Sequence, residues 1–151
     1  MDETYVKIKG KWYYLYRAVD KCGNTVDFLL TKFRDAHAAR FFFTKAIRSS
    51  GRPKTVTIDK SGANKAALNS INNTLPHKLK IKLRQCKYLN NIVEQDHRFI
   101  KHISKPTKGF KSFCSAYATL VGVELHHMLR KGQHKNSKTK SVFEQFYALA
   151  A

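Results

Sequence analysis

Apolar and polar residues alternate along the opening of the chain, and this alternation predicts β-strands. Thr4, Val6 and Ile8 fall on one side of the first strand, and Asp2 shares their parity. A Lys-Gly-Lys turn and a second turn at 20–24 separate the alternating runs. We therefore expect an antiparallel meander of three strands, at residues 4–9, 12–19 and 25–31.

The apolar spacing then changes to steps of three and four residues, which are typical of helices. Asp35 is placed to cap the first helix, and Gly51 with Pro53 ends it. Two short runs predict a buried strand at 55–58 and a strand at a solvated sheet edge at 78–83. Further helices are expected at 62–72 behind a Ser61 cap, from residue 92 to about 103, at 113–131, and after a capping box formed by Ser141 and Glu144.

These elements predict an α/β fold, a mixed five-stranded sheet flanked by helices. The 151 residues suffice for one domain with a genuine core. We place that domain at 1–131, followed by a polar linker and a short helix at 132–151. In the helix at 113–131, apolar residues at helical spacing predict a core stripe of Phe113, Ala116, Tyr117, Leu120, Val121 and Met128.

The charge of the chain indicates its partner. Twenty-nine Lys and Arg against ten Asp and Glu give a net charge of +19, which favours nucleic acid ahead of an anionic membrane surface. No apolar run is long enough to span a bilayer and no signal-peptide pattern is present, so a cytoplasmic protein is expected. Three widely spaced cysteines without a CxxC pair argue against a disulfide framework and against a zinc site.

Three carboxylates stand out in so basic a chain. Asp2 opens the first strand, Asp59 follows the fourth, and Glu94 lies on a helix together with Lys101 seven residues later. Carboxylates from separate elements can hold two Mg²⁺ ions for phosphodiester chemistry, and a lysine on the face of Glu94 can hold a DNA phosphate. The alternative for Glu94 is a surface ion pair with Arg98, and taken alone that alternative is the stronger one.

Several segments resemble a known family. DETYVKIKGKWYYLYRAVD, TVTIDKSGAN and KYLNNIVEQDHRFIK, with GFKSF, HMLRKGQ and EQFYALAA, closely resemble the DDE transposases of insertion sequence family six. The resemblance implies a ribonuclease H-like fold of the retroviral integrase type. It also implies that Asp2, Asp59 and Glu94 are the catalytic triad and the metal ligands, with Lys101 as the family's basic residue.

The resemblance further implies a cofactor, a reaction and partners. The cofactor is a pair of Mg²⁺ ions, for which Mn²⁺ can substitute. The reaction is nicking at element ends and joining of the freed 3′-OH to target DNA, with a cointegrate outcome. The partners are element-end and target DNA and further copies of the chain. DNA contacts are expected from Arg98, Lys101, Lys105, Lys108 and Lys111.

One departure from the family concerns the start of the chain. Relatives carry a helix-turn-helix region before the first Asp, whereas here one residue precedes Asp2. We therefore expect a truncated copy without that region, and salt-sensitive DNA binding without sequence preference. Two alternatives stay open: a basic DNA-binding remnant without catalysis, and a ribonuclease H-type nuclease.

Overall fold

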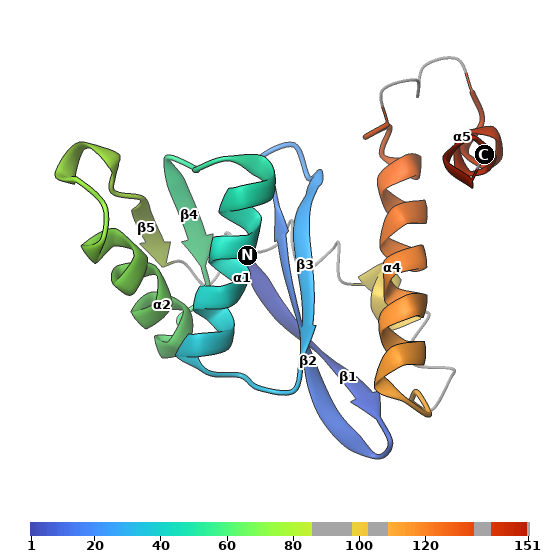
Figure 1. Cartoon of the computed structure of the whole chain (residues 1–151), viewed down its shortest axis with the longest axis horizontal. Helices are drawn as coiled ribbons and strands as arrows, with labels where there is room; N and C mark the ends of the chain where they lie inside the picture. The colour runs from blue at the N-terminus through green and yellow to red at the C-terminus, as the bar shows by residue number, and fades with distance from the viewer. Residues whose placement is uncertain (86–97, 103–108, 135–139, 151) are drawn as a thin grey trace.

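The computed structural model describes residues 1–85, 98–102, 109–134 and 140–150, and Figure 1 shows a mixed α/β arrangement. The first sheet is the expected antiparallel meander of β1 (Asp2–Ile8), β2 (Lys11–Val19) and β3 (Thr25–Thr31). Lys9 and Gly10 both have positive φ, of 48° and 76°. This pair of left-handed residues is what a two-residue hairpin turn between twisted strands requires.

The second sheet contains two parallel strands, β4 (Thr55–Ile58) and β5 (Lys82–Gln85). The prediction of one five-stranded sheet is therefore wrong. In the described part of the chain, the backbone link between the sheets is one hydrogen bond, from the Met1 amino group to Thr57 O at 3.0 Å. Strands β1 and β4 come together only at the start of β1, so no hydrogen-bonded ladder forms between them. Of β4 only Ile58 is fully buried, against the expectation for the whole strand.

The strand predicted at 78–83 begins later than its alternating pattern indicates. Residues His77–Leu79 form a short 3-10 helix, and β5 follows. Asn72 fixes the point of change, because its side chain accepts from Ile81 N at 2.8 Å and donates to Ile81 O at 2.9 Å. These two bonds satisfy the backbone of Ile81 outside a ladder and hold its buried side chain in the core.

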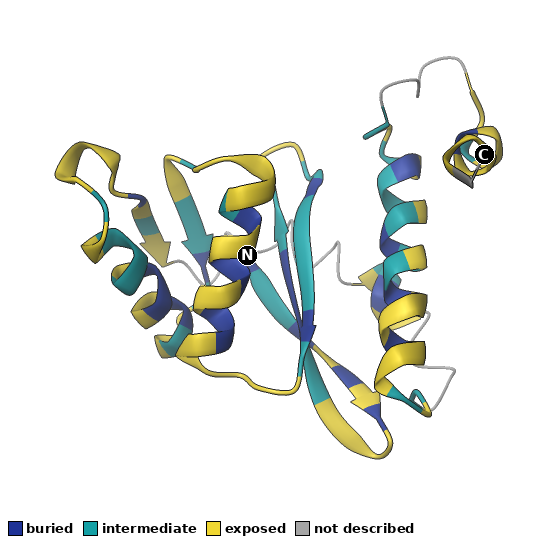
Figure 2. Cartoon of the chain, viewed as in Figure 1, coloured by how far each residue is buried: buried dark blue, intermediate teal, exposed yellow. Residues whose placement is uncertain are grey.

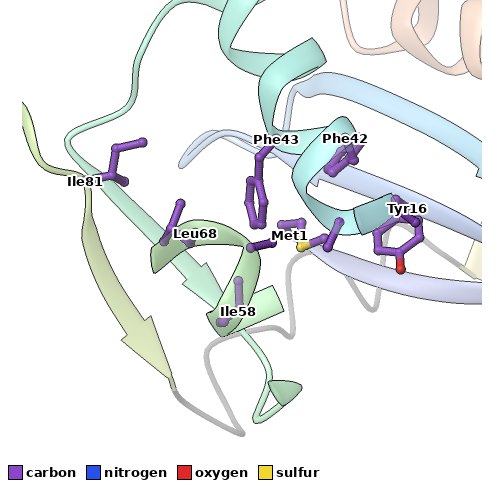
Figure 3. Packing of buried hydrophobic residues seen from close by; sticks show 10 residues of the cluster. Met1, Tyr16, Phe42, Phe43, Ile58, Leu68 and Ile81 are labelled. Atoms are coloured by element: carbon purple, nitrogen blue, oxygen red, sulfur yellow. The ribbon is translucent and has the colours of Figure 1, made fainter. Parts of the chain in front are cut away.

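The first core cluster lies between α1 (Ala36–Ser50), α2 (Gly62–Asn73) and the two sheets (Figures 1 and 3). Asp35 caps α1 as predicted, since its carboxylate accepts from Ala38 N at 2.8 Å. Gly51 ends α1 with φ of 81°. Figure 3 shows the Met1 side chain near Phe42 and Phe43 of α1 and near Ile58 of β4 and Leu68 of α2. The buried members of this first core cluster are Met1, Tyr16, Ala38, Ala39, Phe42, Phe43, Ile58, Ala67, Leu68 and Ile81.

The opposite face of the meander packs against α4 (Phe113–Arg130) and the helical residues 98–102. The predicted parity of β1 is confirmed, because Thr4, Val6 and Ile8 are buried. This second cluster consists of Val6, Ile8, Leu15, Leu30, Ile100, Ala116 and Leu120.

The core stripe predicted on α4 is corrected at two positions. Phe113 and Tyr117 are 42% and 48% exposed, and they stack on each other instead of entering the core. The helix instead buries Glu124, whose carboxylate lies 2.6 and 2.8 Å from the guanidinium of Arg17 on β2. Both side chains are fully buried, so this ion pair joins α4 to the first sheet through a dry interface.

Two further features complete the described chain. Helix α5 (Val142–Ala150) opens with the predicted capping box, in which Ser141 N donates to Glu144 Oε2 at 2.6 Å. Gly109, with φ of 104°, lies so close to β1 that an added Cβ would meet Lys7 O at 3.0 Å. Phe110 then pairs with the end of β1 at Ile8. Among the described helices, none has the length and apolar character needed to cross a membrane.

Candidate metal centre

Hydrophobic packing places Asp2 and Asp59 side by side. Their chain neighbours Met1 and Ile58 are both buried in the first core cluster (Figure 3). The Met1 amino group also donates to Thr57 O, and this hydrogen bond places the start of β1 beside the end of β4. The next residue on each strand therefore leaves the core at the same edge. Two acidic residues far apart in sequence meet because the apolar residues beside them share one core.

A third carboxylate joins them. Asp2, Glu3 and Asp59 each offer one carboxylate oxygen, and these oxygens lie within 4.8 Å of one another. We call these three residues the carboxylate cluster. Glu94, the third member predicted from the sequence, lies outside the described residues.

Asn64 on α2 ties two of the carboxylates together. Its side-chain amide is fully buried and donates to Glu3 Oε1 at 2.8 Å and, at a long 3.5 Å, to Asp59 Oδ1. Asp59 Oδ1 also accepts from Ser61 N at 3.0 Å, so Asp59 starts the turn that leads into α2. The Oδ1 atom of Asn64 is buried and has no hydrogen-bond partner within the described parts of the chain. A fixed amide donor thus orients Glu3 from the side of α2.

The electrostatics of the carboxylate cluster favour a cation. Burial raises the pKa of Glu3, and the charges of Asp59 and Asp2 raise it further, while the hydrogen bond from Asn64 and the charge of Arg34 oppose the rise. Burial lowers the pKa of the Met1 amino group, whereas the negative charges of Asp2, Glu3 and Asp59 raise it. Like charges held this close are costly unless a positive ion lies among them.

Three of the predicted DNA-binding residues are described, and they lie on segments that pack against the second core cluster. Arg98 and Lys101 are exposed on the helical residues beside buried Ile100, which packs into the second core cluster. Lys111 is exposed just before α4. Lys105 and Lys108 lie outside the described residues. The structure therefore brings Asp2 and Asp59 together and leaves Arg98, Lys101 and Lys111 open to solvent.

Sequence reasoning missed Glu3 and Asn64. Strict alternation places Glu3 on the face opposite Asp2, yet an oxygen of each carboxylate lies within 4.8 Å of the other and of Asp59. Asn64 carried a weaker signal: a polar residue in the first turn of the helix that follows Asp59.

Comparison with known proteins gives a coherent set of relatives. A family model described as a DDE domain matches residues 1–133. The transposase for insertion sequence-like element IS431mec of Staphylococcus aureus strain N315 is 40% identical over 144 residues, which are 95% of this chain and 61% of that protein. The transposase for IS257 in transposon Tn4003 of Staphylococcus aureus shows the same figures. The chain thus spans about three fifths of the length of these relatives.

A solved structure shares the fold. A chain of the simian T-cell lymphotropic virus intasome in complex with PP2A regulatory subunit B56 gamma matches 67% of this chain and 37% of its own length, with a TM-score of 0.53. The two sequences are 22% identical over the match. This likeness concerns the arrangement of strands and helices alone.

Proposed function

Because the chain belongs to the family of DDE-domain transposases, we propose that it forms a catalytic core that nicks DNA at the ends of an insertion sequence and joins the freed end to target DNA. The observation that carries this proposal is the meeting of Asp2 and Asp59 at one edge of the fold. We also propose that the fold is ribonuclease H-like, which the likeness to an intasome chain supports, and that the core spans residues 1–131.

The carboxylate cluster fits a divalent metal site. Its donors are hard carboxylate oxygens within 4.8 Å of one another, the type of ligand that Mg²⁺ prefers. We assign Asp2 and Asp59 as ligands, with Glu94 completing the set and Mn²⁺ able to replace Mg²⁺. When bound, a pair of such ions generates the attacking nucleophile and stabilises the leaving oxygen of an in-line displacement.

Other residues of the chain orient the carboxylate cluster and bind the DNA. Asn64 fixes Glu3 and contacts Asp59, so it limits the rotamers that the carboxylate cluster can adopt. Lys101 and Arg98, with Lys105, Lys108 and Lys111, bind DNA phosphates by charge. We further propose that several copies act together, which the exposed apolar side chains of α5 support: Phe143 and Tyr147 are 73% and 72% exposed.

The test is cleavage of labelled DNA carrying the element's terminal sequence, with Mg²⁺, Mn²⁺ or EDTA, beside an RNA–DNA hybrid of equal length. We expect a nick in the DNA with either metal and none with EDTA. Asp59→Asn and Glu94→Gln should abolish the nick, because each keeps its shape and loses a ligand charge. Glu144→Gln, on the exposed start of α5, is the matched control and should retain activity.

Three outcomes would contradict the proposal. Cleavage of the hybrid alone would indicate a ribonuclease H-type nuclease. DNA binding without a nick in either metal would indicate a non-catalytic remnant. Full activity of Glu94→Gln would remove Glu94 from the ligand set and leave the carboxylate cluster, with Glu3, as the whole site.

A further inference from the structure

The hairpin of β1 and β2 carries aromatic and basic side chains on one face. Tyr5 lies opposite Tyr14 in the strand register, and Lys7 lies opposite Trp12. Arg34, just after β3, reaches the same face. We call this group the hairpin face; it consists of Tyr5, Lys7, Trp12, Tyr14 and Arg34.

Contacts run along the hairpin face outward from the carboxylate cluster. Arg34 lies 3.8 Å from Glu3 Oε2, and it donates a 3.0 Å hydrogen bond to the Tyr5 hydroxyl. The ring of Tyr5 meets the ring of Trp12 edge-on, with centroids 6.0 Å apart. Lys7 Nζ then lies 5.8 Å from the centroid of the Trp12 ring. Two aromatic rings with a cation at each end thus form a continuous row of contacts from Glu3 toward the turn.

The hairpin face is exposed at its turn end, where the sheet extends beyond helix α1. Helix α1 packs over the inner end, where Tyr14 contacts the first core cluster. In Figure 1 the turn end of the hairpin projects beyond α1, and Figure 2 shows that end largely exposed. Tyr5 is 52% exposed and Trp12 is 57% exposed. Large rings left in water beside lysines offer a surface that a ligand can cover.

We propose that the hairpin face binds an unpaired stretch of DNA strand and leads it to the carboxylate cluster. The inference rests on the proposed function, and it adds which form of DNA this part of the chain recognises. Unpaired bases have free π-faces that stack on aromatic side chains, whereas a duplex presents chiefly its phosphates to a flat surface. Lys7 and Arg34 are placed to meet the phosphates between stacked bases.

Charge favours this occupant over a second copy of the chain. Residues 4–19 contain four Lys or Arg residues and no Asp or Glu, and three of the four, Lys7, Lys9 and Lys11, are exposed. A second chain of +19 would bring like charges together at this face. A polyanionic strand instead releases counterions as it binds. Glu3 disfavours an anion, and it lies at the inner end of the hairpin face, where the carboxylate cluster begins.

Trp12 makes the test direct, because it is the only tryptophan in the chain. The full chain in EDTA is titrated with an oligodeoxythymidylate of about 16 nucleotides, within the usual site size of such surfaces, while tryptophan fluorescence is recorded. A blunt hairpin duplex with the same number of phosphates is titrated in parallel. We expect saturable quenching by the single strand and weaker quenching by the duplex.

Variants then locate the contact by fluorescence anisotropy of labelled DNA. Trp12→Ala should weaken single-strand binding by at least about fivefold, the lower bound for loss of one base–aromatic stack, and should weaken duplex binding less than twofold. Trp12→Phe should retain most of the affinity, because it keeps a ring. Phe41→Ala removes an equally exposed ring from α1 and should change neither. Circular dichroism confirms that each variant is folded.

The outcomes separate this inference from the proposed function. Equal loss for single strand and duplex, or no loss in Trp12→Ala, would overturn the inference. Nicking of element-end DNA by the same preparations reports on the proposed function alone. A chain that nicks DNA but binds single strands without Trp12 refutes only the hairpin face, whereas selective loss in Trp12→Ala without nicking refutes only the proposed function.

Discussion

At the scale of single residues, Glu3 is the side chain whose position changes the chemistry of the site. It is nearly buried, with 3% of its side chain exposed, and it lies among two other carboxylates. Its contacts with Asn64 and Arg34 show that the fold holds it in place instead of releasing it to solvent. An anion held this way stores an unfavourable energy that a bound cation would relieve.

We predict that Glu3→Gln raises the thermal stability of the metal-free protein at neutral pH. The pKa of Glu3 in the folded protein lies above its ordinary value of 4.5. Below pH 4.5 the side chain is protonated and carries no penalty, and as the pH rises and it ionises the folded protein loses stability. The gain in Tm should therefore be present at pH 7 and vanish as the pH approaches 4.5. Thermal melts across that interval measure it.

Two companion melts sharpen this prediction. Mg²⁺ should stabilise the natural chain more than Glu3→Gln, reversing the order seen in EDTA. Glu144→Gln should show the opposite sign, because hydrogen bonds from the backbone and the hydroxyl of Ser141 lower the pKa of Glu144. A drop in Tm for Glu3→Gln at pH 7 without metal would mean that its bonds outweigh the repulsion.

At the scale of elements, α4 is fixed to the first sheet by the ion pair of Arg17 and Glu124. Both side chains are 0% exposed, so removing the guanidinium of Arg17 leaves the Glu124 carboxylate buried without it. We predict that Arg17→Met alone lowers the free energy of unfolding by about 3–5 kcal/mol, measured by urea denaturation. Arg17→Met combined with Glu124→Leu should recover most of the loss. A loss of similar size in the double variant would show that packing, not charge, is what the single change removes.

The same scale shows what sequence patterns can and cannot predict. Helix α1 was predictable from end to end, because Asp35 and Gly51 act through their own backbone neighbours. The meander followed from strict alternation with glycine turns. The start of β5 did not, because it depends on the side chain of Asn72 nine residues before Ile81. The burial of Glu124 was not predictable either: it lies one turn after Leu120 on the buried face of α4, but its charge assigns it to the surface unless its partner Arg17 is known.

The candidate site likewise contains residues whose positions the sequence predicts and residues whose positions it does not. The proximity of Asp2 and Asp59 was predictable, because each directly follows a residue of the first core cluster, Met1 or Ile58. Their role as metal ligands stays a prediction. Glu3 and Asn64 were not predictable, because their roles arise from contact between β1 and α2, segments about sixty residues apart. Alternation assigns side chains to the two faces of a strand, but it carries no information about which helix residue will contact them. Glu94 and the loop lysines stay predictions.

At the scale of the whole molecule, charge is the dominant property. With a net charge of +19, DNA binding should weaken steeply as salt is added. We predict that Lys101→Ala reduces the slope of log K against log salt by about one and leaves Tm nearly unchanged, since Lys101 is exposed. Lys45→Ala is the control, because Lys45 already pairs with Asp27 at 2.6 Å and should leave the slope unchanged. A large fall in Tm for Lys101→Ala would instead mark a structural role.

The joint between the two sheets has a consequence for local opening. Backbone hydrogen bonding across it amounts, in the described chain, to the bond from Met1 to Thr57, and side-chain packing beneath α1 supplies the rest. The unit from β4 to β5 can therefore exchange its amide protons through an opening that leaves the meander closed. That opening would carry Asp59 away from Asp2 and Glu3. A divalent ion shared by these carboxylates would bridge the joint, so amide exchange in β4 should slow on metal addition while exchange in β2 and β3 stays constant.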